Sequence, residues 1–125
     1  MFTAEYDQQA DIVDKFTALT PLPIAIQVFP NSELASLLSN LSPETPWGDR
    51  QIAAQKLGNL RNPDALPALL AALPTDSFWM VRCAIIQALE KIGDPTAIPT
   101  LQTVGQVDSF QVVRSYATKA IERLS

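Results

Sequence analysis

Apolar residues recur at intervals of three and four along most of the chain beyond residue 31, which is the spacing of one face of an α-helix. The clearest stripe lies in residues 81–92 and consists of Val81, Ile85, Ala88, Leu89 and Ile92. Similar stripes occur in residues 66–73 and 34–38, and short polar segments separate them. The pattern predicts an all-α chain built from pairs of short amphipathic helices.

Capping residues mark where these helices begin and end. An Asn-Pro step at 62–63 and an Asp-Pro step at 94–95 predict the starts of two first helices, with proline at the first helical position. Asp-Ser steps at 76–77 and 108–109 are predicted to cap the second helices. Gly93, followed by Pro95, is typical of a helix end.

The helix pairs repeat with a period of 32 residues, most visibly at Arg50, Arg82 and Arg114. Residues 50–78 are identical to residues 82–110 at ten of 29 positions, where chance would give about two. We therefore expect one domain over 1–125. Its parts are an N-terminal cap and linker at 1–30, a degenerate repeat at 31–60, and repeats at 61–92 and 93–125.

The segment VRCAIIQALEKIGDPTAIPTL, residues 81–101, resembles the HEAT-like repeat of the phycobilisome lyase-like (PBS lyase HEAT-like) family. Residues 50–73 resemble it less closely, with Asn62 in place of the aspartate and Arg61 in place of the glycine. The resemblance implies a short right-handed α-solenoid of HEAT-like helical hairpins with an N-terminal capping segment. It also implies members that bind phycobiliproteins or other photosynthetic proteins in cyanobacteria, and others that are subunits of bilin lyases.

Each repeat carries an acid six residues before its arginine. The three pairs are Glu44 and Arg50, Asp76 and Arg82, and Asp108 and Arg114. In a stack of helix pairs, the arginine of one unit can reach the acid of the next, and its planar fork suits a carboxylate. We expect these six residues to form a structural ladder, without a catalytic role.

The second helices of a helical-repeat stack line its concave surface. Opposite the stripe of Ala53, Leu57 and Leu60, these helices present Gln51, Gln55, Asn59, Cys83, Gln87, Lys91, Ser115, Lys119 and Arg123. Two interpretations remain open for this mildly basic face: a solvated surface, or a groove for an acidic segment of a protein partner.

Two aromatic pairs and the last helix suggest further contacts. Trp47 and Trp79 precede the second helices at equivalent positions, and tryptophan is common both in cores and at binding hot spots. The adjacent Phe78 and Phe110 are expected in the core. Residues 111–124 carry more apolar side chains than one buried face absorbs, so a homo-oligomer through this C-terminal helix is a further hypothesis.

Composition narrows the function class. The chain has 125 residues, a net charge of −4, no histidine and one cysteine. This composition argues against nucleic-acid binding, a metal site, a cofactor and catalysis. No apolar run is long enough to span a membrane, and no signal peptide is evident, so a cytoplasmic location is expected. The sequence therefore predicts a non-catalytic protein–protein interaction module, an adaptor or scaffold, with a subunit or accessory of a bilin lyase as the alternative.

Overall fold

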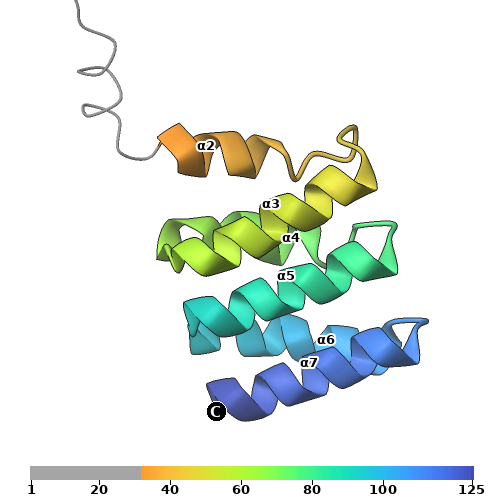
Figure 1. Cartoon of the computed structure of the whole chain (residues 1–125). Helices are drawn as coiled ribbons and strands as arrows, with labels where there is room; N and C mark the ends of the chain where they lie inside the picture. Colours follow the sequence, from red (N-terminus) through yellow and green to blue (C-terminus); the bar gives the residue numbers. More distant parts are fainter. Residues whose placement is uncertain (1–31) are drawn as a thin grey trace, which may run out of the picture. The chain divides into compact units, whose positions relative to one another are not determined.

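The computed structural model describes residues 32–125, of which Leu34–Ser125 form one compact unit. This part of the chain contains six α-helices, two single 3₁₀ turns and no strand, so the all-α prediction is confirmed (Figure 1). The expected N-terminal capping segment, 1–30, lies outside the described residues. In chain order the elements are α2 (Ser32–Ser39), α3 (Trp47–Leu60), η2 (Pro63–Ala65), α4 (Leu66–Ala72), α5 (Trp79–Ile92), η3 (Pro95–Ala97), α6 (Ile98–Val107) and α7 (Gln111–Leu124).

The helices of residues 47–124 lie in two layers. The second helices of the three pairs, α3, α5 and α7, lie side by side in one layer, and α4 and α6 lie behind them (Figure 1). Helix α5 is the middle of its layer and contacts both α3 and α7. It is therefore covered on two flanks by other second helices and at the back by a first helix.

The two Pro-containing steps begin helices as predicted. The side-chain oxygens of Asn62 and Asp94 accept the backbone N–H of Asp64 and Thr96, each at 2.9 Å. Each step opens as a 3₁₀ turn and continues as the α-helix. The prediction for the Asp-Ser steps was wrong in detail, because α5 and α7 begin at Trp79 and Gln111 without a side-chain cap. Asp76 and Asp108 instead accept hydrogen bonds from backbone N–H groups of the loops before these helices.

Helices α3 and α5 end on equivalent residues in the left-handed conformation. Gly93 has φ of 79°, and Arg61, in the corresponding place, has φ of 52°. A residue with a Cβ is unfavourable in this conformation. The side chain of Arg61 is engaged there, because its guanidinium donates to the carbonyl of Lys91 at 3.0 Å. That carbonyl belongs to the last turn of α5, where helix carbonyls lack partners within the helix.

The core runs through all three helix pairs. Its largest fully buried side chains are Leu57, Leu69, Leu73, Val81, Ile85, Ile86, Leu89, Leu101 and Val113. Leu60, expected on the buried side of α3, is exposed at the end of that helix. Helices α3 and α5 approach each other most closely at Gly58, where an added Cβ would lie 2.8 Å from the Cα of Ala88. The small residues at this crossing allow the two backbones to come together.

Candidate functional site

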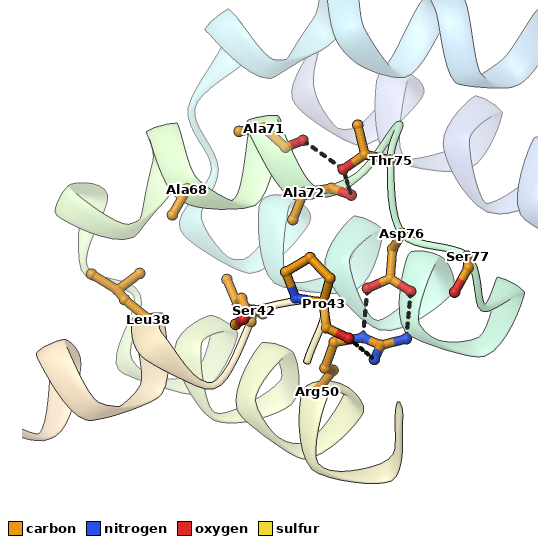
Figure 2. Close-up of a pocket in the computed structure, with 11 residues that line it drawn as sticks. Leu38, Ser42, Pro43, Arg50, Ala68, Ala71, Ala72, Thr75, Asp76 and Ser77 are labelled. Carbon is orange, nitrogen blue, oxygen red and sulfur yellow. Dashed lines mark hydrogen bonds and ion pairs between the residues drawn. The ribbon is translucent and has the colours of Figure 1, made fainter. Parts of the chain in front are cut away.

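An arginine of one helix pair binds the aspartate of the next pair at two places. Arg50 donates from Nε and Nη2 to the two carboxylate oxygens of Asp76, at 2.9 and 3.1 Å (Figure 2). Arg82 binds Asp108 in the same way, at 2.7 and 3.1 Å. We call these two ion pairs the Arg–Asp ladder. All four side chains are at most 10% exposed, so both pairs are largely removed from water.

Each aspartate of the ladder also organises its own loop. The carboxylates of Asp76 and Asp108 accept the backbone N–H two residues later, from Phe78 and Phe110, both at 3.0 Å. Burial disfavours the ionised form of Asp108, but the hydrogen bonds from Arg82 and from the Phe110 N–H outweigh burial and lower its pKa. The aspartate thus joins two consecutive helix pairs while holding the turn between them.

The two ends of the expected ladder differ from its middle. Glu44 pairs with no arginine among residues 32–125, and its carboxylate instead accepts the hydroxyl of Ser42 at 2.7 Å. Arg114 donates to the backbone carbonyl of Asp108, its own loop, as Arg82 donates to the carbonyl of Asp76 at 2.8 Å. No carboxylate within 32–125 forms an ion pair with Arg114. The sequence identified the residue types of the ladder, but not which arginines and acids would form ion pairs.

A hollow of about 490 Å³ opens beside the first rung of the ladder. Figure 2 shows Arg50 and Asp76 at its edge, with Leu38 and Pro43 on one side and the small residues of α4 on the other. Its lining is Leu38, Leu41, Ser42, Pro43, Arg50, Ala68, Ala71, Ala72, Thr75, Asp76 and Ser77. The two charged residues in this lining are paired with each other, so the hollow offers mainly apolar surface.

Aromatic rings stack between the same units. Trp47 stacks on Phe78 with ring centroids 4.4 Å apart, and Trp79 stacks on Phe110 at 5.8 Å. The Arg82 guanidinium lies 5.9 Å from the Phe110 ring. Phe110 is nevertheless 45% exposed, so its expected place in the core was wrong. It closes the last aromatic pair of the described stack, where no further ring covers it.

The predicted partner-binding residues of the second helices come together on the layer of α3, α5 and α7. Gln55, Gln87, Lys91, Lys119 and Arg123 are exposed, and Gln51 is half-buried. Cys83 is the exception, because it is only 8% exposed. The prediction treated α5 as having one buried face. A middle helix is covered on both flanks, which buries every residue from 81 to 86.

The sequence of residues 34–122 matches a family described as HEAT repeats. The chain belongs to the HEAT-repeat family. Repeats of this family generally mediate protein–protein interactions. No curated protein and no solved structure matches the chain.

Two adjoining hollows mark the α5–α7 side of this HEAT-repeat face. The first, of about 210 Å³, is lined by Gln87, Glu90, Tyr116, Lys119 and Arg123. The second, of about 380 Å³, is lined by Arg61, Gln87, Glu90, Lys91 and Arg123. Four cations therefore surround one acid. Arg61, Glu90 and Tyr116 were not among the predicted residues, because their approach depends on how the HEAT repeats stack.

The charges around these hollows are held by contacts between HEAT repeats. Arg123 pairs with Glu90 at 2.7 Å, with side chains 71% and 16% exposed respectively. The Lys91 ammonium donates to the Asn59 side chain at 2.8 Å. Because Glu90 is matched by Arg123, the remaining three cations give the surface a net positive charge.

Cys83 lies at a smaller hollow of about 180 Å³ between the HEAT repeats, lined also by Gln51, Trp79, Met80, Ala84, Gln87 and Tyr116. Burial raises the pKa of its thiol, and Asp108 adds to this rise while Arg82 opposes it. A thiol with a raised pKa is a poor nucleophile near neutral pH.

Among residues 32–125, no group of three or more histidine, cysteine, aspartate or glutamate side chains is placed to hold a metal ion. In the same range, no helix has both the length and the apolar character needed to cross a bilayer.

Proposed function

We propose that the chain is a non-catalytic HEAT-repeat adaptor that binds an acidic segment of a partner protein on the face formed by α3, α5 and α7. The observation that carries this proposal is the ring of four cations around the two hollows that share Gln87, Glu90 and Arg123. A basic, hollowed surface of this kind attracts an acidic chain and orients it. Membership of the HEAT-repeat family supports a protein partner.

The proposal that the adaptor lacks catalysis rests on its chemistry. The chain has no histidine, and its one thiol, Cys83, is buried with a raised pKa. The three arginines of the 32-residue repeat hold loop carbonyls or carboxylates of the fold. These arginines are therefore engaged in the fold, and a buried thiol without a histidine beside it is poorly suited to nucleophilic catalysis.

The setting we propose is the assembly of phycobilisomes or other photosynthetic complexes, in the cytoplasm. This finer proposal rests on the resemblance of residues 81–101 to the phycobilisome lyase-like repeat. The alternative is a subunit or accessory of a bilin lyase. The hollow beside Cys83 measures about 180 Å³, whereas small-molecule pockets usually exceed about 300 Å³, so this thiol offers little room for a bilin.

We also propose that a second copy of the chain could bind through α7, which would give a homo-oligomer. Val113, Ala117 and Ala120 of this helix are buried within the chain, while Val112 is 40% exposed. Val112 is thus the apolar residue of α7 on which a homo-oligomer would depend. Light scattering across a range of concentrations separates this case from a monomeric adaptor.

The proposed face is tested by charge reversal. A Lys91→Glu, Lys119→Glu double variant removes two exposed cations that line the hollows, whereas Lys56→Glu changes an exposed cation that lines neither. Partners are captured from the source cell, identified by mass spectrometry, purified and titrated against each variant. We expect the double variant to bind at least about tenfold more weakly and Lys56→Glu to bind like the parent protein.

Two further results would contradict the proposal. Equal affinity for the parent protein and the double variant would remove the face as the binding site. A shift in the absorbance of a free bilin on mixing with the protein would favour the lyase alternative.

A further inference from the structure

Helix α7 presents a second polar surface, on the side that faces away from α5. This surface is a hollow of about 450 Å³, lined by Gln111, Arg114, Ser115, Thr118, Lys119 and Glu122. The residues 32 positions earlier, in α5, are Trp79, Arg82, Cys83, Ile86, Gln87 and Glu90. Those residues include the ones that α5 uses to bind the next repeat, through the Phe110 stack, the Asp108 ion pair and the Arg123 ion pair. The hollow on α7 therefore occupies the position of an inter-repeat contact.

Most packing residues of that contact have been replaced on α7 by polar ones. Tryptophan becomes Gln111, cysteine becomes Ser115, and the buried isoleucine at 86 becomes Thr118. Such a surface does not favour an apolar helix of the kind found within the stack. Two residues are kept, because Glu122 corresponds to Glu90 and Arg114 to Arg82. Arg114 also keeps the first bond of Arg82, from Nη1 to the carbonyl six residues earlier.

That bond fixes the guanidinium of Arg114 while leaving two donors for a ligand. In Arg82, the Nε and Nη2 groups bind the two oxygens of Asp108. In Arg114, these two groups donate to no carboxylate within residues 32–125. Lys119 adds a second cation to the hollow, and Glu122 is its one acid. A positioned guanidinium fork with net positive surroundings is suited to a carboxylate.

We propose that the outer hollow of α7 is a carboxylate-binding site, centred on Arg114, for an aspartate-containing turn of a partner protein. The chain itself shows the ligand geometry. In both closed rungs the aspartate accepts the arginine fork and also the backbone N–H two residues later. A partner loop with this turn would present its carboxylate in the orientation that the fork accepts.

A second copy of this chain fits the site less well. By the 32-residue period, Glu44 is the acid that a second copy would offer. Its carboxylate accepts the Ser42 hydroxyl. The loop also differs from the other two, because Arg50 binds the carbonyls of Pro43 and Thr45 rather than that of the acid. The loop of the first repeat therefore lacks the aspartate turn of the other two.

The test uses a peptide taken from the chain's own turn. The probe is residues 74–79, PTDSFW, with blocked ends, and the control peptide has asparagine in place of the aspartate. Isotope-labelled full-length protein is titrated with each peptide to millimolar concentration while NMR follows the backbone and the Arg114 Nε–H signal. We expect the aspartate peptide to shift Arg114 and the signals of the outer hollow. The asparagine peptide should bind about tenfold more weakly, since it lacks the charge-assisted bonds.

Three variants localise the effect. Arg114→Gln should abolish the shifts, and Arg114→Lys should weaken them because it keeps the charge but loses the fork. Lys56→Gln changes an exposed cation of α3 that lines none of these hollows, and should leave them unchanged. Circular dichroism and thermal melting confirm that each variant is folded.

Several outcomes would overturn the proposal. These are no shift at millimolar peptide, equal binding of both peptides, and shifts retained in Arg114→Gln. Shifts confined to Arg61 and Lys91 would assign acidic-peptide binding to the face of the proposed function instead. Concentration-dependent shifts without peptide that disappear in Glu44→Gln would replace the partner with a second copy.

Discussion

Arg82 and Asp108 lie 26 residues apart in the chain and meet in a two-bond ion pair, with Nε–Oδ2 and Nη2–Oδ1 distances of 2.7 and 3.1 Å. The carboxylate belongs to the loop that precedes α7, whereas the guanidinium belongs to α5. The contact therefore joins consecutive HEAT repeats at their loop end. Its equivalent between Arg50 and Asp76 shows that the repeat carries the same joint twice.

Replacing Arg82 by alanine should destabilise the protein by about 3 kcal/mol, since it leaves the Asp108 carboxylate largely buried without its partner. Urea unfolding followed by circular dichroism measures the change. Arg82→Lys, which keeps the charge without the fork, should lie between the parent protein and Arg82→Ala. The control is Arg123→Ala, because the Arg123 side chain is 71% exposed and its loss should cost less than about 1 kcal/mol. Equal effects at Arg82 and Arg123 would contradict a structural role for the ladder.

The stabilisation that ionised Asp108 contributes should be lost in acid. Its pKa is lower in the folded state than the value of about 3.9 expected in the unfolded chain. The unfolded state therefore binds protons first as the pH falls. The stabilisation is fully present above about pH 4 and is lost as the pH falls through the folded pKa. Thermal melting between neutral pH and pH 2 tests this.

The matched variant for the acid experiment is Asp108→Asn. It should be less stable at neutral pH and should lose less of its remaining stability on acidification. Asp94, whose pKa is lowered by bonds from the Thr96 N–H and hydroxyl, keeps its own contribution in this variant. An unchanged pH profile in Asp108→Asn would show that the acid sensitivity arises elsewhere.

Two glycines of α3 should respond in opposite ways to alanine. At Gly58 the new Cβ would lie 2.8 Å from the Ala88 backbone, so α3 and α5 must separate. We expect Gly58→Ala to lose about 1–3 kcal/mol, as in other overpacked sites. At Gly48 nothing lies within 4 Å of the added Cβ, and alanine should stabilise the helix by up to about 1 kcal/mol. Melting temperatures that rise in both variants would contradict the close approach of α3 and α5.

Cys83 should react slowly with thiol reagents in the folded protein. Its side chain is buried and burial raises its pKa, so little reactive thiolate is present at pH 8. A colorimetric thiol reagent should modify it at least about tenfold more slowly in buffer than in denaturing urea. Because the chain has one cysteine, the signal has a single source. Equal rates in buffer and urea would show that the thiol is accessible.

The local features of the fold were predictable because they depend on short stretches of sequence. The Asn62 and Asp94 caps require only the residues within one turn, and both form as expected. The 32-residue spacing placed arginines and acids at equivalent positions, which was enough to anticipate that one repeat would bind the next. The outcome at Glu44 was not predictable, because it depends on the shape of the loop that holds it.

The sequence alone determined the helical repeat and the types of residue at each contact between repeats, because both recur at regular spacing along the chain. The tertiary structure decided which of these contacts form ion pairs and which side chains remain accessible to solvent. Cys83 became buried because α5 has a neighbouring helix on each flank, whereas the periodicity of one helix reports only one apolar stripe. Arg61 and Glu90 line the same hollow of the basic face because of packing between repeats. The neighbours of each residue belong to other repeats, so the periodicity of one helix does not predict this contact.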